Sequence, residues 1–407
     1  MSKKILLVSQ YFFPENFRVN DLAAEWHDRG YDVTILTGIP NYPEGKYYDG
    51  YCFFSAGKEN FKGMKVVRLP LIPRGKSSIM LALNYFSFVF FGGIWSLFSR
   101  GKYDRVFVYE VSPITQALPA VWFSKRKKIP CDIYVLDLWP ENFEVMTGIS
   151  NKKIIGILNR MVKYIYKNMT NIFVSSPDFK ISILQKDVPA EKIKYWPQYA
   201  ESFYEPVNIN QLNNKEKYNI KNNDGLSITY AGNIGEAQAL TTLPQVALLL
   251  KNNSQKVCFN IIGDGRDKEN LIKKINELDV NDYFNFIEKQ PAEEIKNYLA
   301  LSDVAFISLS DNPIFSLTIP AKMQSIMACG RPILANSNGV VQTLIDEAEC
   351  GFYADSGEVE QLYLAIEKFI STDKSELVRM GKNAEVYYKN KFEKKSLLDE
   401  MDTYLEV

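Results

Sequence analysis

The chain has 407 residues, which is too long for one ordinary hydrophobic core and suits two domains. Its 46% hydrophobic and 24% charged residues are typical of a globular protein and exclude a disordered chain. The 48 basic and 48 acidic residues balance, but residues 1–200 carry 27 lysines and arginines against 17 acidic residues. A basic first half suits an anionic membrane or a phosphate-bearing partner; an uneven surface charge without function is the alternative.

Cysteine and histidine usage excludes several kinds of site. The five cysteines are scattered and never stand at C-x-x-C spacing, which argues against a disulfide framework and a zinc site and suits a reducing compartment. The only histidine, His27, is expected on the surface of the first helix, so catalysis by a histidine triad is excluded. The apolar run at the N-terminus is too short for a signal peptide and predicts a first strand.

The first half alternates strands with loops and helices. Asp21–Arg29 predicts a helix that ends at Gly30. Near-continuous apolar runs, typical of buried parallel strands, stand at Ile5–Ser9, Tyr31–Thr37, Lys65–Leu69, Arg105–Tyr109, Ile133–Leu136 and Asn171–Val174.

Two segments of the first half are candidates for membrane contact. Residues 79–98 contain no charge and are long enough to span a bilayer, but strands on both sides should belong to one sheet, so a single crossing is excluded. A helix in the membrane interface or one buried in the protein remains, and we favour the interface. Residues 151–169 predict a basic amphipathic helix that adds to this contact or packs on its own core.

The strand pattern restarts after the polar stretch Asn208–Asp224. The strands are expected at Ser227–Tyr230, Val257–Ile262, Tyr283–Ile287, Val304–Ser308 and Pro332–Ala335. Two alternating halves predict an α/β protein with two Rossmann-like domains, whose ligands bind at the carboxyl ends of the strands and in the crevice between the domains. Residues 375–405 predict a long helical tail that returns to the first domain.

Three motifs of the second half indicate a diphosphate site. The turn around Gly232, Asn233 and Gly235 follows one strand, and Gly263-Asp264 follows the next, so backbone N–H groups can approach an anion; tight structural turns are the alternative. Lys322 stands in the first turn of a helix that Pro320 begins. A lysine there opposes the helix dipole, and a bound diphosphate would explain it.

In their order, these motifs resemble the family 4 glycosyltransferases of the GT-B fold. The strings that carry the resemblance are AGNIG, IIGDG, FIEKQPAEEI and PAKMQSIMACGRPILA, while QYFFPE, LTGIPNYP and DLWPE are similar to the WbuB-like branch of O-antigen, capsule and exopolysaccharide enzymes. The resemblance implies two Rossmann-like domains facing each other across a cleft. They are an acceptor-binding domain at 1–200 with the membrane-associating helix 79–98, a nucleotide-sugar domain at 201–385, and a helix at 386–407 that crosses back.

The resemblance also implies the activity. We expect a metal-independent, retaining glycosyltransferase without a cofactor, which moves an amino or deoxy sugar from a UDP-sugar to an undecaprenyl-diphosphate-linked saccharide. It would act in surface polysaccharide synthesis, in the cytoplasm and peripherally on the inner face of the cell membrane. No nucleic acid partner is expected.

Motif matches assign the donor site. The residues implied are Gly232, Asn233, Gly235, Gly263, Asp264, Ile287, Glu288, Ser316, Thr318, Ile319, Lys322, Gln324 and Ser325. Family members commonly carry two glutamates at the positions of Leu317 and Ser325. The second usually binds the ribose, so here either Ser325 or Gln324 replaces it or the ribose is held more weakly.

Carboxylates of the first half are the candidates for handling the acceptor hydroxyl. We expect Asp137 first and Glu15 second to act catalytically, with Lys322 at the leaving phosphate. For Asp137 a hydrogen bond within its loop is the alternative. The acceptor site is expected to contain Arg18, Asn41, Tyr42, Trp139 and Glu141. The aromatic residues Tyr42, Trp139 and Trp196 either stack on sugars or pack in the hinge.

Two other functions fit the same architecture. A two-domain nucleotide-sugar epimerase needs acid and base groups around the sugar, and the membrane-like helix weighs against it. A non-catalytic nucleotide-binding scaffold would explain the missing glutamates. An oxidoreductase is disfavoured because neither glycine turn reads G-x-G-x-x-G.

Overall fold

The computed structural model describes residues 2–55, 57–75, 77–148, 151–212, 215–222 and 224–406. The chain divides into two compact units, the first made of residues up to Trp196 and from Asp402 on, the second of Pro197–Met401. The sequence places these boundaries at 200 and 385. The second boundary lies later because the last helical turn packs on the first unit: Asp402 pairs with Arg29 at 2.6 Å, and the ring of Tyr404 lies 5.1 Å from Phe173.

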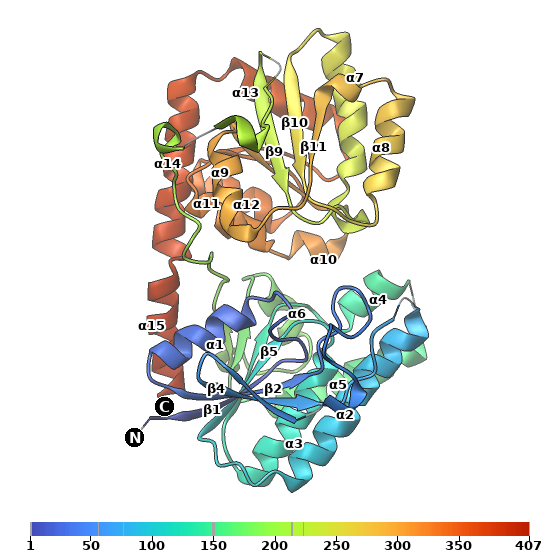
Figure 1. Ribbon diagram of the computed structural model, residues 1–407, viewed down its shortest axis with the longest axis vertical. Coiled ribbons are helices and arrows are strands. Elements are labelled where there is room, and N and C mark those ends of the chain that lie inside the picture. Colours follow the sequence, from blue (N-terminus) through green and yellow to red (C-terminus); the bar gives the residue numbers. More distant parts are fainter. Residues whose placement is uncertain are drawn as a thin grey trace. The chain divides into compact units, whose positions relative to one another are not determined.

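The first unit, which contains the labelled strands β1, β2, β4 and β5 of Figure 1, is built on an eight-stranded sheet. The strand order is β3-β4-β2-β1-β5-β6-β7-β8. All neighbours pair in parallel except β3 and β4. The strands are β1 (Lys4–Val8), β2 (Asp32–Gly38), β3 (Gly57–Phe61), β4 (Met64–Leu69), β5 (Arg105–Glu110), β6 (Cys131–Val135), β7 (Ile172–Val174) and β8 (Ile193–Tyr195). The helices are α1 (Val19–Asp28), α2 (Ser78–Phe98), α3 (Ala117–Lys127), α4 (Glu141–Thr147), α5 (Lys152–Lys167) and α6 (Phe179–Leu184).

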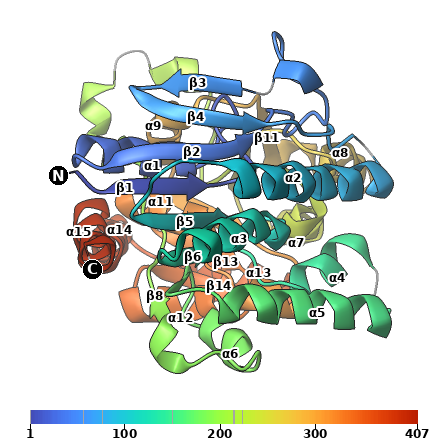
Figure 2. The same cartoon turned by 90° about the horizontal axis from the view of Figure 1, so that it is seen from below.

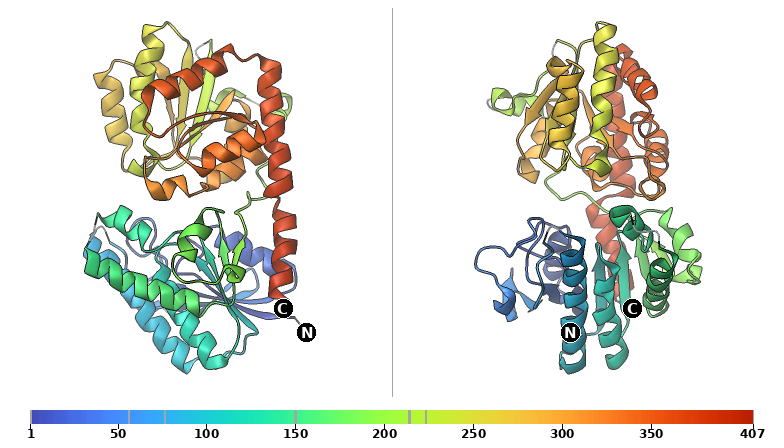
Figure 3. Two further views of the ribbon diagram at one scale, coloured as in Figure 1. Left: turned by 180° about the vertical axis from the view of Figure 1, so that it is seen from behind. Right: turned by 90° about the vertical axis from the view of Figure 1, so that its right-hand side faces the viewer.

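The second unit is built on a six-stranded parallel sheet in the order β11-β10-β9-β12-β13-β14. Its strands are β9 (Leu226–Ala231), β10 (Val257–Ile262), β11 (Phe284–Ile287), β12 (Val304–Ser308), β13 (Ile333–Asn336) and β14 (Gly351–Ala354). Helices cover both faces of this sheet (Figure 3). They are α7 (Leu243–Asn252), α8 (Lys268–Glu277), α9 (Ile295–Ala300), α10 (Pro313–Ser316), α11 (Ala321–Ala328), α12 (Val340–Ala348), α13 (Val359–Ser371), α14 (Lys374–Lys391) and α15 (Lys394–Leu405).

Both sheets thus have the doubly wound topology that the alternating pattern predicts. Apolar side chains of the strands and of the helices covering them form the cores, as in the cluster around Ile228, Phe259 and Phe306. The helical tail differs from the prediction of one long helix. It consists of α14 and α15, which are separated at Phe392. The buried side chain of Phe392 belongs to the core cluster of the second unit that contains Met323 and Ile333.

The uncharged segment forms α2, which lies against α3 (Figure 2). A Cβ at Gly92 would stand 2.5 Å from Pro119 Cγ, so this glycine allows the two helices to approach closely. The strands on both sides of α2, β4 and β5, belong to the same sheet, as expected. Among the described residues α2 is the one helix long and apolar enough to cross a membrane, by length and composition, and most of it is not buried.

Candidate functional site

Two glycine turns of the second unit meet at the carboxyl ends of β9 and β10. Gly232 has a φ of +143° and Gly263 a φ of +137°, which side chains rarely adopt. A Cβ at Gly263 would stand 2.0 Å from the carbonyl oxygen of Gly232, and one at Gly232 would stand 2.6 Å from Lys322 Nζ. The two turns and the lysine therefore pack together only because both positions are glycine.

Lys322 is the cation of this site. Its Nζ donates to the hydroxyl of Tyr230 at 2.6 Å and lies 3.9 Å from the centre of that ring, while the hydroxyl donates to the carbonyl of Asn233. Burial lowers the pKa of Lys322 to about 7. Within the described part of the chain no carboxylate pairs with it. A buried ammonium without a counter-ion is costly, and an anionic ligand would relieve that cost.

The other predicted donor residues divide into those near the turns and those that face the core. Asn233 is exposed and donates to Gln238 at 3.0 Å, Asp264 is exposed and lies 3.8 Å from Lys268, and Glu288 is exposed at the end of β11. The N–H of Gly263 donates to the carbonyl of Ile287 at 3.1 Å, so the end of β11 adjoins the turns. The Ile287 side chain itself lies in the core.

The segment before α11 is held by its own hydrogen bonds. The hydroxyl of Ser316 donates to Pro313 and that of Thr318 donates to Ile314, each at 2.8 Å. Ile319 packs in the core. The segment therefore presents a fixed backbone beside Lys322 rather than mobile side chains.

The predicted ribose contacts are wrong in one case and weakened in the other. Gln324 is fully buried, and its amide nitrogen, in the orientation that satisfies its surroundings, donates to the carbonyls of Pro320 and Ala321 at 3.2 Å. The Ser325 hydroxyl is nearly buried and reaches the carbonyl of Ala321 at 3.4 Å. Gln324 points inward because α11 is packed on nearly all sides.

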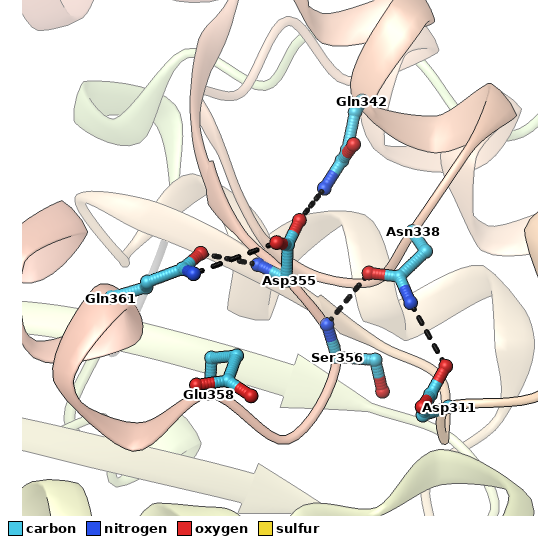
Figure 4. A pocket seen from close by; sticks show the side chains of 7 residues that line it. All are labelled: Asp311, Asn338, Gln342, Asp355, Ser356, Glu358 and Gln361. Atoms are coloured by element: carbon cyan, nitrogen blue, oxygen red, sulfur yellow. Dashed lines mark hydrogen bonds between the residues drawn. The ribbon is translucent and has the colours of Figure 1, made fainter.

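A polar hollow stands at the ends of β12, β13 and β14, and sequence reasoning missed it (Figure 4). Asn338 links its two sides, because it donates to Asp311 at 3.0 Å and accepts from the N–H of Ser356 at 2.9 Å. Gln342 donates to Asp355 at 2.8 Å. Its three carboxylates, those of Asp311, Asp355 and Glu358, disfavour a diphosphate, in contrast to the site of Lys322.

Asp137 of the first unit lies at the end of β6, partly exposed. Its carboxylate accepts the N–H of Ser112 at 2.9 Å, and its own N–H donates to Glu110 Oε2 at 3.4 Å. Glu110 is fully buried, and its other oxygen has no hydrogen-bond partner among the described residues. Burial, followed by the charge of Asp137, raises the pKa of Glu110 well above its usual value. Burial therefore favours the neutral form of Glu110 beside Asp137, and Glu110 was not predicted from the sequence.

Glu15 is enclosed by backbone N–H donors, whereas the sequence predicts a catalytic carboxylate. One oxygen accepts the N–H groups of Asn41 and Tyr42 at 2.8 and 2.7 Å, and the other accepts the N–H of Phe12 at 3.2 Å. The side chain is 1% exposed, and burial raises its pKa to about 7 against the lowering effect of these bonds. It fixes the loop that carries Tyr42.

Three expected acceptor residues are bonded within the protein. Asn41 is fully buried and accepts the N–H of Arg74. Trp139 is buried and donates to Ser112 at 3.1 Å, and the half-buried Glu141 is paired with Lys186 at 2.5 Å. Trp196, for which the sequence left stacking on a sugar open, is buried against Tyr134 and Phe173.

Two expected acceptor residues, Tyr42 and Arg18, keep part of their surface open. Tyr42 is half-buried at the carboxyl edge of the sheet, and Arg18 is half-buried at the start of α1. His27 is half-buried rather than on the open surface, with its Nε2 close to Gly63.

We predict that Gly263→Ala destabilises the protein by at least about 2 kcal/mol, because the new methyl group meets a carbonyl oxygen and the backbone angle suits glycine. Gly156→Ala is the matched control. Gly156 lies in α5 with open space around it, and the same change there should stabilise slightly. Chemical denaturation of both variants measures the difference, and equal stabilities would contradict the close approach.

Comparisons with known proteins give a matching family model for each unit. Residues 16–198 match the family model "Glycosyl transferase 4-like domain", and residues 210–387 match "Glycosyl transferases group 1". The amylovoran biosynthesis glycosyltransferase AmsK of Erwinia amylovora is 26% identical over 164 residues, which cover 39% of this chain and 40% of that protein. The match thus spans less than half of the relative's length.

Solved structures share the whole fold. Sucrose-phosphate synthase of Thermosynechococcus elongatus superposes with a TM-score of 0.75 at 14% identity, covering 99% of this chain and 98% of that chain. Anabaena HepE in complex with UDP and glucose has a TM-score of 0.72 at 15% identity and 99% coverage of both chains. These identities show the fold alone. Through its 4-like first unit and its group 1 second unit, the chain belongs to the glycosyltransferases of the GT-B fold.

Proposed function

We propose that the protein transfers a sugar from a nucleoside diphosphate donor to an acceptor held at a membrane. The observation that carries this proposal is Lys322, a buried cation without a carboxylate partner in the described residues, set against two glycine turns. Such an arrangement fits a diphosphate leaving group, whose charge grows as the bond to the sugar breaks. Anabaena HepE was solved with UDP, which supports UDP as the nucleotide.

The chemistry that we propose is metal-independent and retains the anomeric configuration. The bond between the sugar and the diphosphate breaks, the acceptor oxygen bonds to the same carbon, and its proton leaves to a nearby base. Lys322 and backbone N–H groups of the turns would stabilise the leaving diphosphate. No group of three or more potential metal ligands occurs in the described ranges.

Asp137 is the base that we propose for the acceptor hydroxyl. It is partly exposed, and the N–H of Ser112 fixes its carboxylate, whereas Glu15 is enclosed by backbone donors. Glu110 would remain protonated behind it and keep the charge of the pair at one. Arg18 and Tyr42 stay candidates for contacts with the acceptor.

The membrane part of the proposal rests on the outer face of α2. Its polar and small residues, among them Asn84, Ser87 and Ser96, face the first unit and are buried. Its outward side chains are large, apolar and between 41% and 77% exposed: Ile79, Leu83, Phe86, Phe90, Ile94, Leu97 and Phe98. Such a face suits the interface of a bilayer, with both helix ends held in the protein.

Helix α5 adds a basic amphipathic face. It exposes Ile154 and Ile157 beside Lys152 and Lys153, and basic residues attract anionic lipids. We therefore propose peripheral attachment to the cytoplasmic face of the cell membrane and a lipid-linked acceptor such as an undecaprenyl-diphosphate saccharide. The amylovoran biosynthesis relative supports a role in polysaccharide synthesis. An amino or deoxy sugar as the donor sugar, and a cell-surface product, belong to the proposal through the motif resemblance alone.

Donor binding should depend on pH through Lys322. In the free protein its pKa is about 7, and a bound diphosphate favours the charged form, so binding takes up a proton above pH 7. UDP affinity should fall by up to about tenfold per pH unit between pH 7 and 9. Lys322→Met should bind weakly and without this slope. Isothermal titration with UDP, GDP and NAD measures both, and Lys273→Met, an exposed lysine on α8, is the control.

Failure of every nucleotide to bind wild-type protein would refute the donor site. Binding of UDP without transfer to any lipid-linked acceptor would favour the non-catalytic scaffold.

Substitutions at Asp137 and Glu110 distinguish the proposed base from the proposed neutral acid. Asp137→Asn should lower turnover by at least about 100-fold with unchanged UDP affinity, because the acceptor proton loses its base. Glu110→Gln should keep most of the activity, since glutamine mimics the protonated acid. Loss of turnover in Glu110→Gln with normal folding and UDP binding would show that Glu110 works as a carboxylate instead. Initial rates across pH 6–9 provide the measurement.

Vesicle binding tests the outer face of α2. Phe86→Ser and Phe90→Ser should each weaken binding to phosphatidylcholine–phosphatidylglycerol vesicles by about 1–2 kcal/mol, because each removes apolar area from the interface. Leu364→Ser and Val378→Ser, exposed on the second unit, are the controls. Co-sedimentation of all four variants gives the comparison, and equal effects in both pairs would remove α2 from membrane contact.

A further inference from the structure

Arg74 lies in the connection that leads from the carboxyl end of β4 to α2. The guanidinium carbon of Arg74 lies 5.1 Å from the ring centre of Tyr42. The side chain is half-buried, and no carboxylate of the described residues forms an ion pair with it. An arginine fixed over a ring leaves its N–H donors available for an anion.

Backbone contacts hold this connection in place. The N–H of Gly75 donates to the carbonyl of Gly45 at 3.0 Å, and a Cβ at Gly45 would stand 2.5 Å from the carbonyl oxygen of Gly75. The N–H of Arg74 donates to Asn41 Oδ1 at 2.9 Å, and Asn84 of α2 reaches the same oxygen at 3.4 Å. Arg74 is therefore fixed relative to α2 before any ligand binds.

A second, buried tyrosine packs against the ring that Arg74 covers. Tyr11 is 2% exposed, its hydroxyl has no hydrogen-bond partner among the described residues, and its ring lies 5.6 Å from that of Tyr42. Burial raises the pKa of Tyr11, whereas the charge of Arg74 lowers it. Arg74 and Tyr11 thus both contact the ring of Tyr42.

We propose that Arg74, together with the hydroxyl of Tyr11, binds a phosphate group of the acceptor. The inference rests on the proposed function and adds a site to it. An unpaired guanidinium near a phenol O–H donor matches a phosphate, which accepts hydrogen bonds through several oxygens and carries the opposite charge. A cationic group would be repelled by Arg74, and a purely apolar group would leave the buried Tyr11 hydroxyl without a partner.

The position of the site fits a phosphate at a membrane surface. Arg74 precedes the start of α2 by four residues, and α2 carries the apolar outer face. A lipid whose chain lies along that face would hold its phosphate close to the helix start.

Binding in the Lys322→Met background tests the proposal, because that change removes the cation of the donor site. The soluble probe is inorganic pyrophosphate, and the membrane probe is farnesyl diphosphate in phosphatidylcholine vesicles. Adding Arg74→Ala should weaken both at least tenfold, and Arg74→Lys should weaken them less. Arg100→Ala, at the exposed far end of α2, is the matched control and should change pyrophosphate binding less than twofold.

Each outcome supports or overturns the proposal. Weaker binding of both probes supports a site that binds phosphate regardless of the group attached to it. Weaker binding of the vesicle probe alone supports a site for membrane-held phosphate. Affinities within twofold of the background for both probes would overturn the proposal. UDP titration of Arg74→Ala with Lys322 intact reports separately on folding and on the donor site, so failure of the proposed function is distinguishable. Tyr11→Phe, which removes only the hydroxyl, should weaken both probes severalfold.

Discussion

The structure of the second unit depends on how a buried ammonium is accommodated. Lys322 is enclosed beside Tyr230 and has no carboxylate partner in the described residues. A nearby carboxylate would stabilise the empty protein but would compete with any anionic ligand. Its absence keeps the pKa of Lys322 low and leaves part of the electrostatic stabilisation to the ligand. The glycine turns follow from the same constraint, because a side chain at Gly232 would occupy the position of the ammonium.

The first unit uses neutral polar groups for a related purpose. Asn84 lies in the middle of an apolar helix and would be costly if it were unpaired. It donates to the carbonyl of Ile72 at 2.5 Å and accepts from Gln10 at 2.8 Å, and it reaches Asn41. These bonds tie the outer apolar face of α2 to the loop that carries Tyr42. A force on α2 at a membrane would therefore be transmitted to that loop by short, directional bonds rather than by loose packing.

The fold and the donor turns could be predicted because their signals are local. Parallel strands read as apolar runs, and a glycine turn after such a run needs no knowledge of distant residues. The sequence does not show which side chains of α11 face the core. Met323 to Ala328 are all buried, so the helix has no exposed polar face that would set its orientation. Gln324 therefore reads as a ligand in the sequence and lies in the core.

The errors in the first unit have a different origin. Glu15 resembles a catalytic carboxylate in the sequence, but its main partners are N–H groups of residues 41 and 42, and only the tertiary structure brings them together. Glu110 was missed because a single glutamate at the end of an apolar strand carries no motif; burial and the neighbouring Asp137 give it its character. Local sequence thus indicates where the glycine turns lie, whereas long-range contacts decide how deeply each carboxyl group is buried.

That division has a chemical consequence for the proposed acceptor site. Glu15, Glu110 and Asp137 belong to one unit, and three negative charges there would repel an acceptor that carries phosphate. Burial raises the pKa of Glu15 to about 7 and that of Glu110 well above its usual value, which favours the neutral forms and reduces this repulsion. Arg74, which pairs with no carboxylate of the described residues, then provides attraction for a phosphate. The first unit can in this way hold the proposed base Asp137 and an anionic acceptor together.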